Sequence, residues 1–222
     1  MILPKKKLRL PALGASRAFS LIELLIVLNI TLYFFWLTIP AFNSITQAYG
    51  VTEAAYNVSS AVERARSEAV ARKTYVWLGI QQVIIEGSPG LSVGIVCSKD
   101  GAANTNATNL LPLGKPLVIQ RVGMVPAVSL GAGTLTSGAI DLQGVTGGMS
   151  FQIGKILFQD GRTITFMPLG EATTNPVPTL TSGFDRLMIL TFREVRGDSL
   201  FPGNDVTVAI DGSVGVPAIY RK

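Results

Sequence analysis

The chain has 222 residues, 48% of them hydrophobic, and it carries 19 Lys and Arg against 14 Asp and Glu. It contains no histidine, which excludes Ser-His-Asp triads, histidine acid–base catalysis and histidine-bearing metal sites, and its one cysteine cannot form an internal disulfide. Five of the cations and none of the acids lie within the first 17 residues, so the remaining chain has 14 charges of each sign. A nucleic-acid binder should show a basic footprint, and this remainder lacks one on average.

A charge-poor apolar segment follows the basic leader. Ala18 to Pro40 form a run long enough to cross a bilayer, and its one charge, Glu23, lies near the start. No charged side chain occurs from Leu24 to Phe42. A carboxylate at membrane depth costs roughly 2.5–3.5 kcal/mol, so a simple anchor should have an apolar residue there. The position of Glu23 therefore indicates a function that needs a partner for the carboxylate.

Two simpler interpretations are a membrane anchor with an incidental Glu and a secretory signal peptide. A signal peptide has its small-residue cleavage site after the apolar core. Here the small residue Ala18 precedes the run, so cleavage would leave the apolar helix on the mature protein. Cations flank the run on one side only, which places the leader in the cytoplasm and the rest of this single-pass chain beyond the inner membrane. These cations are Lys5, Lys6, Lys7, Arg9 and Arg17.

The start of the apolar run resembles the prepilin signature of type IV pilins and type II secretion pseudopilins. In that family a small residue precedes the cleaved bond, an aromatic residue becomes the new N-terminus, and Glu is the fifth mature residue. Ala18, Phe19 and Glu23 fill these places, although the family's usual residue before the cut is Gly. The resemblance implies that a prepilin peptidase cuts between Ala18 and Phe19 and that the amine of Phe19 is N-methylated. It also implies that Phe19 and Glu23 make the filament contact, as an amine–carboxylate pair, and that Pro40 kinks the helix.

The helical pattern continues beyond the apolar run. Small apolar residues recur at three- and four-residue spacing, which predicts an amphipathic helix; they are Ala55, Val58, Val62, Ala65 and Ala69. We expect one long, bent helix from about Phe19 to Lys73, with weak points at Pro40 and Gly50. Its second part has one face for packing against a globular domain.

From Thr74 onward the pattern changes to β-branched and aromatic runs separated by turns. Strands are predicted at 74–85, 91–98, 115–125, 151–158, 162–169, 186–195, 205–212 and 213–220, and surface loops at 99–109, 129–150 and 170–183. The predicted fold is α+β, a pilin-like lollipop whose long N-terminal helix packs its second half on an antiparallel β-rich head. The expected domains are a prepilin leader (1–18), a transmembrane or filament-core helix (19–42), an amphipathic stem (43–73) and a periplasmic head (74–222).

Residues that could carry chemistry have simpler explanations. Cys97 lies in an apolar run and is expected to be a small buried hydrophobe rather than a reactive thiol. Asp100, Asp160 and Asp211 each precede Gly at the end of an apolar run, which predicts turns rather than paired catalytic carboxylates. The Gly-rich stretches lack the context of a phosphate loop. We therefore expect no enzyme activity, no cofactor and no metal site.

A second resemblance concerns the end of the stem. Ser60 to Ile80 is similar to the GspH/FimT group of minor pseudopilins and minor pilins, which often carries an ARSEA-type segment there; the matching residues here are Ala65, Arg66, Ser67, Glu68, Ala69, Val70 and Arg72. Near the C-terminus the group tends to have a Gly-Arg turn, and this chain has Ser213 where Arg is common. The resemblance implies a structural subunit that assembles with other pilins into a type II secretion pseudopilus or a type IV pilus.

The main alternative is a DNA-binding minor pilin for natural transformation. Its cations would be Arg64, Arg66, Arg72 and Lys73 on the helix, or Arg221 and Lys222 at the C-terminus. The helix cations are interleaved with Glu63 and Glu68, which favours a solvated, self-paired face. The balanced charge and the missing Arg of the turn also argue against nucleic acid as a partner.

Overall fold

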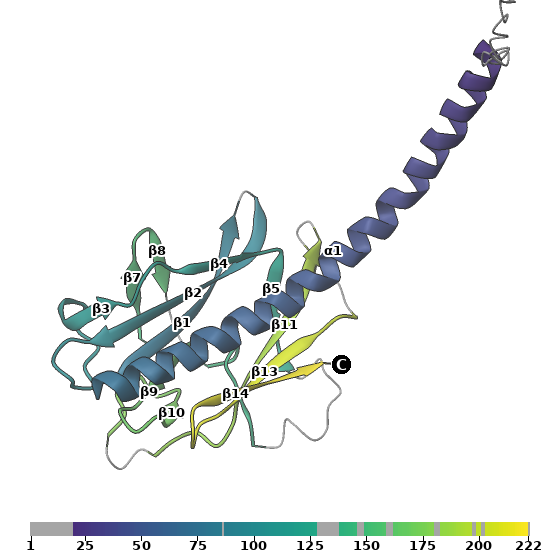
Figure 1. Ribbon diagram of the computed structural model, residues 1–222. Helices are drawn as coiled ribbons and strands as arrows, with labels where there is room; N and C mark the ends of the chain where they lie inside the picture. Colours follow the sequence, from purple (N-terminus) through teal and green to yellow (C-terminus); the bar gives the residue numbers. More distant parts are fainter. Residues whose placement is uncertain are drawn as a thin grey trace, which may run out of the picture. The chain divides into compact units, whose positions relative to one another are not determined.

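The computed structural model describes residues 20–85, 87–127, 138–145, 149–158, 162–179, 183–196, 199–200 and 203–221, without the side chains of 39–49. The chain divides into two compact units, Met1–Ser44 and Ile45–Lys222. A single helix, α1 (Leu21–Arg72), contributes to both units and stays helical across Pro40 and Gly50 (Figure 1). The predicted kink at Pro40 stays a prediction.

A hydrogen-bonded cap ends α1. The N–H of Thr74 donates to the carbonyl of Ala69 at 3.1 Å, and the N–H of Lys73 donates to the carbonyl of Val70 at 3.4 Å. Lys73 itself has a φ of 52°, in the left-handed region. Together these features form a Schellman motif, in which Lys takes the place usually held by Gly. The helix therefore ends one residue before the predicted end.

Two six-stranded sheets and a separate hairpin make up the described strands of the second unit. The first sheet has the order β10-β9-β1-β2-β3, and β4 also pairs with β2. Its strands are β1 (Val76–Ile85), β2 (Ser88–Ser98), β3 (Leu110–Pro112), β4 (Leu117–Gln120), β9 (Thr163–Phe166) and β10 (Ala172–Thr173). The short 3-10 helix η1 (Ala107–Asn109) leads into β3.

The second sheet has the order β12-β11-β13-β14, with β5 and β6 both paired to β11. Its strands are β5 (Val122–Val125), β6 (Ile140–Asp141), β11 (Met188–Arg196), β12 (Ser199–Leu200), β13 (Val206–Asp211) and β14 (Val216–Arg221). The β6–β11 pair is parallel. The other pairs in the described residues are antiparallel, so the predicted α+β class with an antiparallel β-rich unit is confirmed.

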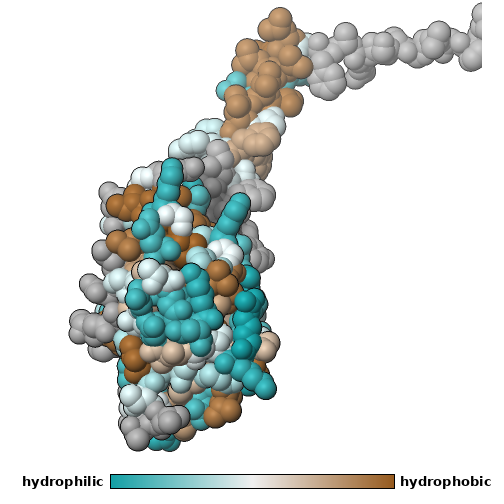
Figure 2. Space-filling view, turned by 90° about the vertical axis from the view of Figure 1, so that its left-hand side faces the viewer, coloured by the Kyte–Doolittle hydropathy of each residue, from teal (hydrophilic) through white to brown (hydrophobic). Residues whose placement is uncertain are grey.

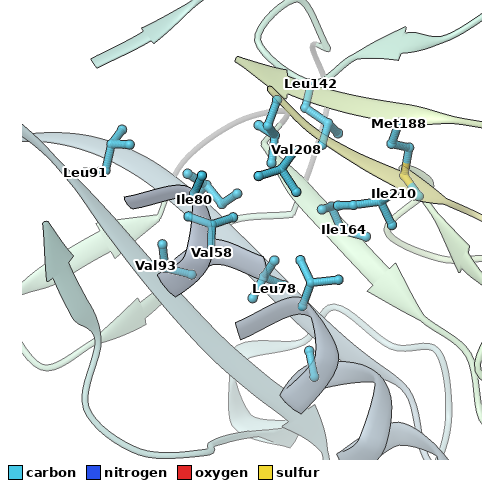
Figure 3. Close-up of a cluster of buried hydrophobic side chains, with 14 of the residues drawn as sticks. Val58, Leu78, Ile80, Leu91, Val93, Leu142, Ile164, Met188, Val208 and Ile210 are labelled. Atoms are coloured by element: carbon cyan, nitrogen blue, oxygen red, sulfur yellow. The ribbon is translucent and has the colours of Figure 1, made fainter. Parts of the chain in front are cut away.

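The apolar stripe of α1 lies at the centre of the hydrophobic core. All five residues of the predicted stripe are fully buried, and Val51 and Ala54 extend it by another turn. The stripe packs against β1 and β2 of the first sheet and β13 of the second (Figure 3); the partners include Leu78, Ile80, Leu91, Val93, Val208 and Ile210. The small side chains allow the helix backbone to approach both sheets closely. The predicted packing of the second half of the helix on the β-rich unit is thus confirmed.

One predicted strand, 115–125, is wrong because the run divides between the two sheets. Arg121 separates β4 from β5 and has a φ of 59°, which turns the chain. On either side of it, β4 pairs with β2 and β5 pairs with β11. Neither Arg121 nor its two neighbours is a typical turn residue such as Gly, Pro, Asn or Asp, so the change of sheet depends on tertiary pairing.

Another predicted strand, 151–158, is a tight hairpin of β7 (Phe151–Ile153) and β8 (Ile156–Phe158). It turns at Gly154, which has a φ of 62°. Two short strands lie inside predicted loops, β6 within 129–150 and β10 within 170–183. The last strand starts at Val216 rather than at Ser213, which belongs to the turn after β13.

Candidate functional site

A pair of polar side chains, Ser20 and Glu23, marks the start of α1. The N–H and Oγ of Ser20 both donate to Oε2 of Glu23, each at 2.9 Å, and the N–H of Glu23 donates to Oγ of Ser20 at 3.3 Å. The carbonyl of Ser20 accepts the first hydrogen bond of the helix, from Leu24. This arrangement is a capping box, in which the residue before the helix and its third residue satisfy each other's backbone donors.

The helix that follows has the length and polarity of a membrane span. Leu21–Thr38 has a mean hydropathy of 2.0, and Glu23 is its one charged residue. The large apolar side chains between Leu21 and Leu37 are 51–82% exposed. Hydrophobic residues make up most of the face of this helix that is visible in Figure 2, with a few hydrophilic residues among them. A surface of this kind is stable when lipid or other apolar helices surround it.

Three neutral polar side chains of this segment, Asn29, Thr31 and Thr38, donate hydrogen bonds within the helix. Nδ2 of Asn29 donates to the carbonyl of Leu25 at 2.9 Å, and Oγ1 of Thr38 donates to the carbonyl of Phe34 at 2.8 Å. Thr31 makes the equivalent bond to Val27. Such internal bonds lower the cost of placing these groups in hydrocarbon. Glu23 differs from them because a carboxylate has two oxygens and a charge to compensate.

The predicted site residues are only partly covered by the structure. Ala18 and Phe19, the predicted cleavage and methylation residues, lie outside the described residues. Glu23 lies at the first turn of the helix, as predicted. The sequence interpretation missed Ser20 as a contact of Glu23, although the Ser-x-x-Glu spacing before an apolar run is the signal of a capping box.

In the second unit, the residues considered for chemistry have structural roles. Cys97 is buried on β2 and burial raises the pKa of its thiol, so it is a packed hydrophobe rather than a reactive group. Asp100 and Asp211 accept hydrogen bonds from backbone N–H groups two residues further on, which confirms their predicted turn role. Asp160 lies outside the described residues. Within the described residues, no group of three or more His, Cys, Asp or Glu could hold a metal ion.

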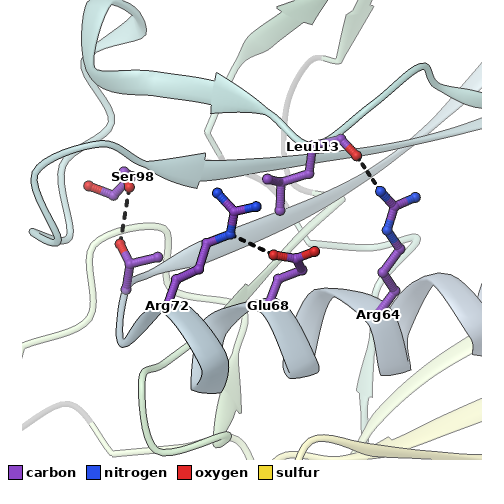
Figure 4. Close-up of polar contacts among 6 residues, drawn as sticks. Arg64, Glu68, Arg72, Ser98 and Leu113 are labelled. Atoms are coloured by element: carbon purple, nitrogen blue, oxygen red, sulfur yellow. Dashed lines mark hydrogen bonds and ion pairs between the residues drawn. The ribbon is translucent and has the colours of Figure 1, made fainter.

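The cations near the end of α1 are largely engaged in intramolecular contacts. Arg72 forms an ion pair with Glu68 at 2.6 Å, and Nη2 of Arg64 donates to the carbonyl of Leu113 at 2.6 Å (Figure 4). Arg66 is half-buried, and its Nε has no hydrogen-bond partner in the described part of the chain. Near the C-terminus of the chain, Arg221 donates to Oγ1 of Thr52 on α1 at 2.8 Å. These contacts leave fewer free cations for phosphate groups than the sequence pattern suggests.

Comparison with protein families, with curated proteins and with solved structures gives no match for this chain. The residues themselves are therefore the basis for a functional assignment. They define a helix long and apolar enough to span a membrane, with one self-capped carboxylate at its start, followed by an antiparallel β-rich unit.

Proposed function

We propose that the protein is a pilin-like filament subunit. In this proposal a prepilin peptidase removes residues 1–18 in the inner membrane, and Phe19 becomes the N-methylated N-terminus. The apolar part of α1 then passes from the bilayer into the core of a type II secretion pseudopilus or type IV pilus. The β-rich head projects from that core on the periplasmic side. The ARSEA-type segment at the end of the stem supports the GspH/FimT group of minor subunits.

A single observation carries the proposal: one carboxylate, Glu23, lies at the start of an otherwise charge-free apolar helix, directly after a basic leader. A carboxylate in that position is unfavourable for an isolated membrane helix. It becomes favourable when a neighbouring subunit supplies a positive N-terminal amine, because opposite charges attract strongly in apolar surroundings. Cleavage before Phe19 creates such an amine four residues from Glu23.

Mass spectrometry of the mature N-terminus tests the processing step. We expect the chain purified from membranes or filaments to begin at methylated Phe19. An intact Met1 would contradict the proposal. A terminus beyond Pro40 would instead identify the apolar segment as a removed signal peptide.

Substitution of Glu23 tests the assembly step. Glu23→Gln and Glu23→Val should leave membrane insertion and folding of the head intact while strongly reducing the filament-associated fraction, because neither side chain can neutralise an amine. The measurement is the ratio of filament-associated protein to total membrane protein, compared with the wild type. Normal incorporation of the Glu23→Val protein would show that the carboxylate is dispensable.

The DNA-uptake alternative has less support. Outside the leader the charges balance, and Arg64 and Arg72 are engaged by Leu113 and Glu68. Ser213, at the position where an Arg would be expected, donates to Oδ1 of Asp211 and so stabilises a turn. A membrane-anchored enzyme has no catalytic constellation in the sequence to support it.

A further inference from the structure

A cavity of about 360 Å³ lies in the second unit, between α1 and the turn 113–116 that joins β3 to β4. The turn exists because these two strands pair with different parts of β2. Between the pairs Val96–Pro112 and Val93–Leu117, two residues of β2 stand opposite four residues of the other segment, so the extra residues bulge away from the sheet. The bulge opens a space beside the helix.

Two cations line this cavity, Arg64 on α1 and Lys115 on the turn, and none of the described residues that line it is acidic. Nη2 of Arg64 donates to the carbonyl of Leu113 at 2.6 Å, which holds the guanidinium at the turn without neutralising its charge (Figure 4). Neither cation forms an ion pair within the described part of the chain. Two positive charges without an acidic partner thus share one cavity, which favours a single anion as its occupant.

The rest of the lining combines apolar and neutral polar groups. Val93 and Ile95, alternate residues of β2 on the face that packs on α1, contribute apolar side chains, and Leu117 adds a third. Asn57 and Ser60, three residues apart on α1, supply an amide and a hydroxyl. Their side chains make no hydrogen bond among the described residues. The cavity therefore offers charge, hydrogen-bonding groups and apolar surface within a small space.

We propose that this cavity binds the carboxyl end of another protein chain. A C-terminal residue presents a negative carboxylate, a peptide group and a side chain close together, and the cavity has a counterpart for each. Arg64 and Lys115 match the carboxylate, Asn57 and Ser60 match the peptide group, and the apolar residues match the side chain. Guanidinium and carboxylate groups form strong, charge-assisted hydrogen bonds. The inference does not depend on the filament function, because it uses residues of the second unit alone.

Other anions fit this lining less well. Nucleic acid is held by several cations along a row of phosphates, whereas this cavity has two cations beside apolar side chains. A free fatty acid would match the cations and the apolar side chains. It would also cover Asn57 and Ser60 without giving them a hydrogen-bond partner, which is unfavourable.

Binding of small probes to the full-length chain in nonionic detergent micelles tests the proposal. The main probe is the dipeptide N-acetyl-alanyl-leucine with a free carboxylate, followed through the backbone amide NMR signals of Gly114 and Lys115. We expect saturable binding in the millimolar range. The same dipeptide with a C-terminal amide should bind about tenfold more weakly, because it lacks the charge. Hexanoate and inorganic phosphate should each bind more weakly than the free-acid dipeptide.

Substitutions test the place of binding. Arg64→Gln and Lys115→Gln should each weaken binding of the free-acid dipeptide about tenfold. Lys115→Gln is the more decisive variant, because Arg64→Gln also removes the hydrogen bond to Leu113 that holds the turn. Lys155→Gln is the matched control and should leave binding unchanged. It removes an exposed Lys from the turn of the β7–β8 hairpin, which packs on the face of the first sheet opposite to α1.

Several outcomes would overturn the inference. Absence of binding by the free-acid dipeptide, or equal binding of its amide, would show that the cavity does not recognise a terminal carboxylate. Unchanged binding to Lys115→Gln would place the dipeptide outside this cavity. Tighter binding of phosphate would assign a phosphate-bearing ligand such as nucleic acid, and tighter binding of hexanoate would assign a fatty acid. Failure of the filament function would leave all these results unchanged, because the measurement involves no filament.

Discussion

The hairpin β7–β8 packs on the first sheet at Gly79 and Gly94, where the absence of a side chain leaves room for its aromatic rings. Gly79 on β1 and Gly94 on β2 lie directly opposite each other in the first sheet. The stacked rings of Phe151 and Phe158, with centroids 4.9 Å apart, cover these two positions. A Cβ added at Gly94 would lie 2.5 Å from Cζ of Phe158 and 2.9 Å from Cδ1 of Ile153. Ala at this position therefore forces the buried ring to move.

The expected magnitude combines two opposing effects. Ala restricts the unfolded chain more than Gly does, which stabilises the folded state by roughly 0.5–1 kcal/mol in a strand. Forcing an extra methyl into a packed core costs about 1–3 kcal/mol. Phe158 is 2% exposed and stacked on Phe151, so the ring cannot swing into solvent. We expect Gly94→Ala to lower the free energy of unfolding by about 1–2 kcal/mol.

Urea unfolding of the fragment 45–222, which is the second compact unit, measures this change when followed by circular dichroism. Gly50→Ala is the control, because Gly50 lies in α1 and, apart from its chain neighbours and the helix backbone, no described atom lies within 4 Å of the added Cβ. That substitution should leave the free energy of unfolding unchanged or raise it by up to about 1 kcal/mol. The same change in residue type thus has opposite expected signs at the two positions. Equal or greater stability of Gly94→Ala, with an unchanged urea slope, would refute the packing argument.

Two further predictions concern the same fragment. It should be monomeric and indifferent to metal chelators. It should also bind DNA weakly at most, because it has about as many acids as bases and Arg72 is paired with Glu68. Tight, salt-sensitive DNA binding in a titration at physiological salt would instead favour the DNA-uptake function. The carboxyl of Asp100 should titrate with a pKa of about 2, because the side chains of Asn109 and Ser98 and the N–H of Ala102 donate to it. Since this pKa lies below the unfolded value, Asp100 stabilises the fold fully above pH ~4, and that contribution is lost as the pH falls through about 2. NMR titration of the Asp100 carboxyl carbon measures this pKa. Asn109→Ala should raise the titration midpoint. A midpoint at the ordinary Asp value in the unaltered fragment would contradict the hydrogen bonds assigned to Asp100.

The sequence by itself determined the helix, the class of fold and the buried stripe. Apolar residues at three- and four-residue spacing require one helix face to be covered, and the residues of the predicted stripe are all buried. Runs of β-branched residues identified most of the long strands, such as β1, β2, β11 and β13. For the candidate site, the charge pattern alone identified Glu23, because a carboxylate in an apolar run needs a physical reason. These signals are local, so they can be read along the chain.

Only the tertiary structure decided which sheet each strand joins and which side chains meet. The continuous run 115–125 divides at Arg121, and the interior glycines Gly79 and Gly94 form one platform because β1 and β2 pair in a particular register. The contact of Ser20 with Oε2 of Glu23 likewise depends on the geometry of the first helical turn, although its spacing is visible in the sequence. Strand pairing and side-chain packing join residues far apart in the chain, so no local pattern specifies them. The sequence therefore identifies the charge that needs a partner, and the folded geometry shows that Ser20 donates to one of its two oxygens.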